Sequence, residues 1–156
     1  MAGDKTPFYE GWTEKDEKTY ESVFDFLREN FNGYKLFFKP KMGRTDASKY
    51  NLTGFEPLPP DISLEEVCLR HNIQKVISIR STSSKVGAYF GIPSYMLYPL
   101  FPIPESFKEG IEQEHYDMRS VVRVSKIGDL LKKPKLFSNE YSFEKLANLY
   151  WEAVVK

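Results

Sequence analysis

The stretch KVISIRSTSSKVGAYFGIPSYMLY, residues 75–98, is the part of the sequence that decides the expected fold. It contains an apolar strand, four consecutive hydroxyl residues, a short helical segment and a second apolar strand. Apolar strands that alternate with helices are typical of a parallel sheet covered by helices. The hydroxyl residues Ser81, Thr82, Ser83 and Ser84 follow the first strand, at the position where such a sheet presents its carboxyl edge.

The alternation continues toward the N-terminus. Thr13 and Asp16 form a capping-box pattern, apolar residues then recur at helical spacing, and Gly33 marks the end of the helix. A second capping-box pattern begins at Ser63. The sequence predicts helices at 13–32, 63–71 and 83–90 and strands at 34–40, 75–79 and 94–101, with at most a short strand within 52–60. The expected class is α/β, with a Rossmann-like parallel sheet and helices on both faces.

The pattern is looser after Pro104. It predicts a polar helix at 105–118, a short strand at 121–124, a basic connection and a last helix at 142–155. We expect the last helix to pack back on the sheet, so that residues 1–156 form one domain.

Composition limits the classes of partner. The 22 basic and 22 acidic side chains among 156 residues cancel, so no net charge recruits nucleic acid or an anionic membrane. The single cysteine, Cys68, cannot form an internal disulfide and is expected to be buried. No apolar run approaches the roughly 20 residues of a spanning helix, and no secretion signal is visible. We therefore expect a soluble, cytoplasmic protein with no membrane span, leaving peripheral membrane association open.

Three polar segments follow or flank the expected strands. The strand at 34–40 is followed by three cations, Lys39, Lys41 and Arg44, and the strand at 75–79 is followed by the hydroxyl residues 81–84. The helix between these two strands begins with Ser63 and Glu65. The three segments thus supply cations, hydroxyl groups and one carboxylate. Together they suit a nucleotide, with the phosphate on the cations and hydroxyls and the ribose on the carboxylate.

Each segment also has a purely structural interpretation. The serines can cap a helix, the lysines can be solvated, and Glu65 can complement a helix dipole. The sequence has no G-x-G-x-x-G, no Walker lysine motif, no H-E-x-x-H and no cysteine pair, so dinucleotide, P-loop and zinc chemistry have no basis. We expect no metal and no cofactor.

Three segments together carry a family resemblance. LFFKPKMGR, SLEEV and VISIRSTSSKVGAYFGIPSYMLY, within residues 34–100, resemble the C-terminal, donor-binding domain of bacterial sialyltransferases and polysialyltransferases of the GT-B architecture. In that family a histidine after one strand and paired hydroxyls after another hold the phosphate of CMP-sialic acid, and a glutamate holds the ribose. The resemblance implies that Lys41 stands at the histidine position, Ser83 and Ser84 at the hydroxyl pair, and Ser63 and Glu65 at the base and ribose contacts.

The resemblance also implies an activity and its partners. It implies inverting, metal-independent sialyl transfer to a glycan acceptor in polysaccharide biosynthesis, with the general base supplied by an N-terminal GT-B domain. This chain alone is then expected to bind the donor without catalysing transfer. Lys41 and Met42 replace the family's histidine and proline, so Lys41 would neutralise phosphate charge where the histidine donates a proton. A noncatalytic protein-interaction module and a UDP-sugar enzyme domain remain the alternatives.

Overall fold

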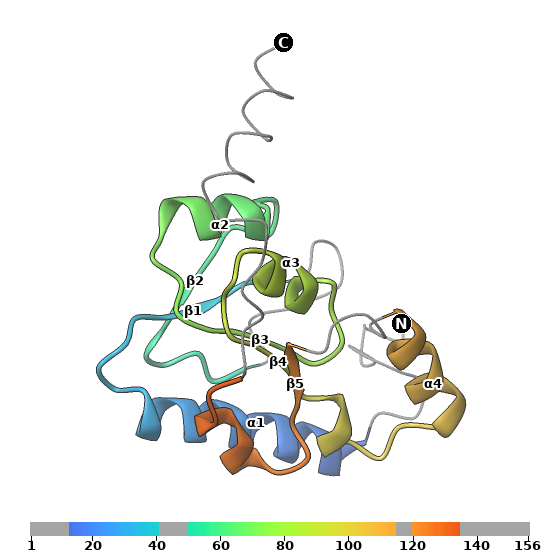
Figure 1. Ribbon diagram of the computed structural model, residues 1–156. Helices are drawn as coiled ribbons and strands as arrows, with labels where there is room; N and C mark the ends of the chain where they lie inside the picture. The colour runs from blue at the N-terminus through green and yellow to red at the C-terminus, as the bar shows by residue number, and fades with distance from the viewer. Residues whose placement is uncertain (1–12, 41–49, 115–119, 135–156) are drawn as a thin grey trace. The chain divides into compact units, whose positions relative to one another are not determined.

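The computed structural model describes residues 13–40, 50–114 and 120–134, and these form an α/β protein with two parallel sheets flanked by helices (Figure 1). The chain divides into two compact units. Unit 1 comprises the chain up to Ser63 together with Leu100–Pro102. Unit 2 comprises Leu64–Pro99 and the chain from Ile103 onward.

Unit 1 contains α1 (Glu14–Asn30), β1 (Leu36–Phe38) and β2 (Phe55–Pro57). The two strands are parallel. The predicted capping box is confirmed: Asp16 accepts hydrogen bonds from the Thr13 amide at 2.8 Å and from its hydroxyl at 2.7 Å. The predicted helix therefore begins where the sequence indicates, and it ends within about one turn of Gly33.

The core of unit 1 is an aromatic cluster around Phe24 of α1. The Phe24 ring lies 5.2 Å from that of Phe55 and 5.9 Å from that of Phe38, measured between ring centroids, so α1 packs on both strands. Tyr20 and Tyr50 complete the cluster, with ring centroids 4.9 and 6.0 Å from Phe24. Edge-to-face contacts of this kind stabilise a small core beyond the area that they bury.

Unit 2 contains a three-stranded parallel sheet in the order β3-β4-β5. Its elements, in chain order, are α2 (Leu64–Arg70), β3 (Val76–Ser78), α3 (Ser83–Tyr89), β4 (Ser94–Met96), the 3₁₀ turn η2 (Tyr98–Leu100), α4 (Glu105–Glu114), β5 (Val121–Arg123) and the 3₁₀ turn η3 (Ile127–Leu131). Leu100, the last residue of η2, is assigned to unit 1.

Helix α3 covers one face of the unit 2 sheet and lies unusually close to it (Figure 1). A Cβ atom added at Gly87 would meet the Ser94 hydroxyl oxygen at 2.3 Å and the Val76 Cγ2 atom at 2.9 Å. Only glycine therefore lets the α3 backbone rest on β3 and β4 at this point.

The η3 turn covers the opposite face of the same sheet. Side chains alternate between the two faces of a strand, so Tyr95 points away from the face that Ser94 and Gly87 share. The Tyr95 hydroxyl donates to the Lys132 carbonyl, and the Lys75 ammonium lies 4.6 Å from the centre of the Tyr95 ring and donates to the Leu130 carbonyl.

The predicted element order is confirmed throughout the described residues, but the strands are short and lie in two sheets, one in each unit. The strand predicted at 94–101 ends at Met96 and turns into η2, because Pro99 has no amide to continue the ladder. The helix predicted at 142–155 lies outside the described residues. No described helix combines the length and the apolar composition that crossing a membrane requires.

Candidate functional site

The carboxyl edge of the unit 2 sheet brings together the segments that follow three strands. The strands are parallel, and Ser78, Met96 and Arg123 lie opposite one another at their ends. The backbone continues this register for one further step, since the Leu97 amide donates to the Ser78 carbonyl at 2.8 Å and the Val124 amide donates to the Met96 carbonyl at 2.9 Å. This is the edge at which open α/β sheets bind ligands.

Ser84 joins α3 to the sheet at this edge. Its side chain is fully buried, and its hydroxyl oxygen lies 2.6 Å from that of Ser78 and donates to the Tyr95 carbonyl at 3.4 Å. A buried hydroxyl without partners is costly, so these bonds stabilise the contact between α3, β3 and β4. In this conformation the Ser84 hydroxyl stabilises the packing of α3 on the sheet and is not accessible to a ligand.

The other three predicted hydroxyls lie nearer the surface. The Ser81 hydroxyl oxygen lies 2.9 Å from that of Ser83 and accepts a hydrogen bond from the Ser83 amide at 3.2 Å. Thr82 is exposed, and its hydroxyl forms no cap bond with α3. Ser81, Thr82 and Ser83 therefore offer hydroxyl groups at the carboxyl end of β3.

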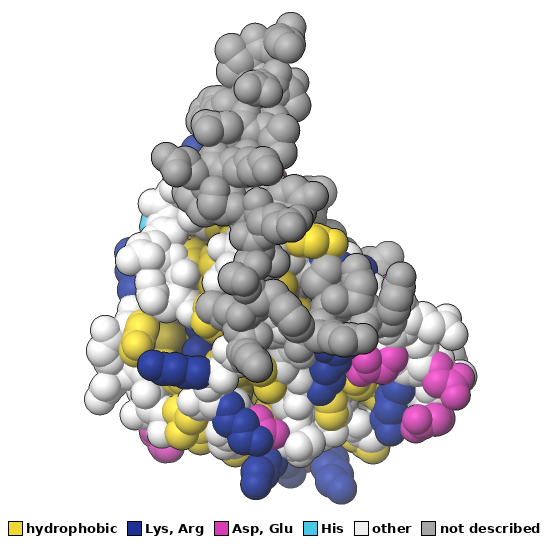
Figure 2. Space-filling view, viewed as in Figure 1, with side chains coloured by type: hydrophobic (Ala, Val, Ile, Leu, Met, Phe, Trp, Pro, Cys, Tyr) yellow, Lys and Arg dark blue, Asp and Glu magenta, His cyan; other side chains and the backbone are white. Residues whose placement is uncertain are grey.

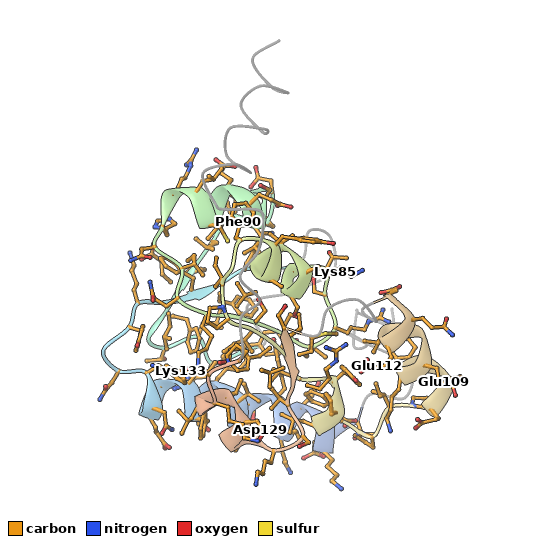
Figure 3. All side chains as sticks on the ribbon, viewed as in Figure 1. Lys85, Phe90, Glu109, Glu112, Asp129 and Lys133 are labelled. Atoms are coloured by element: carbon orange, nitrogen blue, oxygen red, sulfur yellow. The ribbon has the colours of Figure 1, made fainter. Side chains whose placement is uncertain are left out.

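Helix α4 supplies two side chains to the same edge. Phe107 lies beneath the guanidinium of Arg80, whose Cζ atom is 4.2 Å from the ring centroid. Glu112 pairs with Arg123 at 3.0 Å and accepts a hydrogen bond from the Tyr98 hydroxyl. In Figure 3, Glu112 lies on the side of α4 toward the sheet and Glu109 on its outer side.

Burial and the hydrogen bond from the Tyr98 hydroxyl to Glu112 both affect the pKa of the Tyr98 phenol. Burial, together with the hydrogen bond to Glu112, raises the pKa of Tyr98 to about 12. The phenol is therefore a neutral hydrogen-bond donor at neutral pH, and its bond to Glu112 joins η2 to α4. The outer surface of α4 is acidic (Figure 2).

Arg80 and the cluster of Tyr98, Glu112 and Arg123 were missed in the sequence analysis. Arg80 stands between the strand and the hydroxyl residues, so its place after an apolar strand was a usable signal. The pairing of Glu112 with Arg123 had no such signal, because the two residues are brought together only when α4 and β5 pack.

The remaining predicted residues are distributed over both units. Lys39 follows β1 in unit 1, and its ammonium donates to the Pro60 carbonyl at 3.3 Å. Ser63 is also assigned to unit 1, as the last residue before unit 2 begins at Leu64. Glu65 lies in the first turn of α2 in unit 2. Lys41 and Arg44 lie outside the described residues. Among the predicted site residues that the structure describes, only the hydroxyl residues 81–84 are brought together within one unit.

Cys68 is buried in α2, as expected. Burial, with a smaller effect of the nearby Glu65 carboxylate, raises the pKa of the Cys68 thiol to about 11. A protonated, buried thiol is a poor nucleophile, so Cys68 belongs to the core. In the part of the chain that the structure describes, no group of three or more histidine, cysteine or acidic side chains could hold a metal ion.

Similarity to known proteins adds nothing to this geometry. Comparison of the chain with protein-family models, with curated proteins and with solved structures finds no match.

Proposed function

We propose that this chain is the donor-nucleotide-binding part of a sialyltransferase-like glycosyltransferase that uses CMP-sialic acid. The observation that carries the proposal is the gathering of Ser81, Thr82 and Ser83 at the carboxyl edge of a parallel sheet. Hydroxyl groups at such an edge suit the phosphate oxygens of a nucleotide. The resemblance of residues 34–100 to the family's donor-binding domain supports the choice of nucleotide.

In this proposal the chain contributes binding and electrostatic stabilisation. The hydroxyls bind the phosphate that links the sugar to cytidine, and Lys41 offsets the charge that develops as CMP leaves. An acidic residue of an N-terminal GT-B domain would deprotonate the acceptor hydroxyl. The chain by itself then binds CMP but transfers no sugar.

Calorimetric titration of the chain with CMP, and separately with UDP, tests the proposal. We expect CMP to bind with a Kd of about 1 mM or lower. Hydrogen bonds to charged groups are worth about 1.5–3 kcal/mol, so the double substitution Thr82→Ala with Ser83→Ala should raise the Kd of CMP by about tenfold or more. The matched control is Thr53→Ala, an exposed threonine of unit 1, which should leave the Kd unchanged.

A second candidate function is a noncatalytic protein-interaction module. It is favoured by the large apolar side chains that stay exposed, with 49% of Tyr89 and 53% of Leu131 accessible in unit 2. Absence of binding to both nucleotides would favour this module and contradict the glycosyltransferase proposal. Tighter binding of UDP than of CMP would instead favour a UDP-sugar enzyme.

A further inference from the structure

Two arginines, Arg80 and Arg123, lie at the carboxyl edge of the unit 2 sheet, and only one of them is paired with a described carboxylate. Arg123 is neutralised: its guanidinium nitrogens lie 3.0 and 3.3 Å from the Glu112 carboxylate oxygens, and a third donates to the Val121 carbonyl at 2.8 Å. Arg80 is exposed and forms no ion pair with any residue that the structure describes. Of these two arginines, Arg80 is the one whose charge is not paired with a described carboxylate.

The guanidinium of Arg80 is nevertheless held in place. Its Cζ atom lies over the Phe107 ring, 4.2 Å from the ring centroid, a separation at which the ring attracts the cation. A guanidinium on a ring keeps its edge N–H groups directed outward, where they can bind two oxygens of a phosphate at once. Stacking also lowers the entropy that a mobile arginine loses on binding.

Arg80 is adjacent in sequence to the exposed and partly exposed hydroxyl residues. It is the residue directly before Ser81, and the hydroxyl groups of Ser81, Thr82 and Ser83 therefore follow it along the same turn at the end of β3. A phosphate ester carries negative charge and accepts hydrogen bonds, so an arginine that directly precedes three hydroxyl residues offers groups of the right chemistry to bind it.

We infer that Arg80 is a cation that binds the phosphate of the nucleotide, in addition to the role proposed for Lys41, and that Phe107 of α4 is its positioning residue. The inference deepens the proposed function and rests on it for the identity of the nucleotide. It also assigns a role to α4, a helix that carries no expected site residue.

The experiment compares variants of the full chain in titrations with CMP and with cytidine, which lacks the phosphate. We expect Arg80→Ala to raise the Kd of CMP by about tenfold or more and to leave the Kd of cytidine unchanged. Arg80→Lys keeps the charge without the planar stack, and Phe107→Leu removes the ring; each should raise the Kd of CMP by about threefold. The matched control is Arg70→Ala in α2, an exposed arginine paired with Glu66, which should change neither Kd.

The outcomes separate this inference from the proposed function. Binding of CMP by Arg80→Ala with the wild-type Kd would overturn the inference and leave the proposed function standing. If the wild-type chain binds neither CMP nor UDP, the proposed function fails, and line broadening of the ³¹P resonance of inorganic phosphate decides the inference. Broadening that disappears in Arg80→Ala would sustain the anion site, and its absence in the wild type would overturn it.

Circular dichroism checks that the Arg80→Ala chain folds. Because Arg80 is exposed, we expect its melting temperature to stay close to that of the wild type. If Arg80→Ala does not fold, the Kd of CMP for Arg80→Lys decides the inference, and a wild-type value overturns it.

Discussion

The two units hold a helix against parallel strands in opposite ways. In unit 1, the large ring of Phe24 fills the space between α1 and the strands, in contact with the rings of Phe38 and Phe55. In unit 2, no side chain separates α3 from the strands at Gly87, so the helix backbone comes close to Val76 and Ser94 at that position.

The difference bears on where each unit can hold polar chemistry. Rings fill an interface with apolar area and need no hydrogen-bond partners. A close backbone contact leaves room only for small side chains, and the hydroxyls of Ser78 and Ser84 satisfy each other there. In unit 2 the contact between α3 and the sheet thus includes small polar side chains, and one of them, Ser78, lies at the carboxyl end of β3.

The largest expected effect comes from removing the ring in unit 1. Phe24→Ala deletes a buried aromatic side chain that contacts four other rings, and such deletions cost about 3–5 kcal/mol. Urea unfolding followed by circular dichroism measures the loss. Tyr34→Ala is the control, since 57% of Tyr34 is exposed, and it should cost less than about 1 kcal/mol. Equal losses for the two variants would show that the aromatic cluster does not stabilise unit 1.

An intermediate effect is expected from adding a methyl group at the close contact in unit 2. In Gly87→Ala the new Cβ overlaps Ser94 and Val76, and overpacking of this kind costs about 1–3 kcal/mol, reduced by the better helix propensity of alanine. Gly110→Ala in α4 is the matched control, because no atom lies within 4 Å of the added Cβ. The control should be neutral or slightly stabilising in the same urea titration.

Ser94→Ala removes the atom nearest to the new Cβ and should recover part of the loss in the double variant. A Gly87→Ala chain as stable as the wild type would contradict the close contact between α3 and the sheet.

The smallest expected effect concerns the buried Asp129 in η3. The Lys132 ammonium at 2.7 Å and then the Lys126 amide at 3.0 Å hold the pKa of this carboxyl well below its usual range. Because the folded-state pKa lies below the unfolded value of about 3.9, the stabilisation is fully present above that value and is lost as the pH falls below it.

Unfolding by urea between pH 5 and pH 2 measures this contribution. We expect the free energy of unfolding to decline less steeply with falling pH in Asp129→Asn than in the wild type. Asp25→Asn, at an exposed acid of α1, provides the comparison for a surface carboxylate. Equal slopes for Asp129→Asn and the wild type would remove the charge-based account of the η3 turn.

Much of the fold could be predicted because the signals are local. The Thr13 capping box and the alternation of apolar strands with helices depend on neighbouring residues, and the structure has these elements in the predicted order. The division into two sheets could not be predicted, since strand pairing depends on contacts between residues far apart in the sequence.

The candidate site was predictable in part for the same reason. The hydroxyl residues 81–84 follow a strand, and that position alone placed them at the carboxyl edge. The role of each hydroxyl was not predictable: Ser84 is buried against Ser78, while Thr82 is exposed. One residue of difference in a helical turn rotates a side chain by about 100°, so which hydroxyl meets the sheet depends on how α3 docks.

The order of strands and helices, the helix ends and the position of the hydroxyl residues after β3 follow from local propensity and spacing, which are properties of short segments. Three features, by contrast, depend on how the elements pack. Ser84 is buried against the sheet, Glu112 pairs with Arg123, and the Arg80 guanidinium lies over the Phe107 ring. These contacts join residues that lie 6, 11 and 27 positions apart, so their geometry is specified by the docking of α3 and α4 on the sheet and not by any single stretch of sequence.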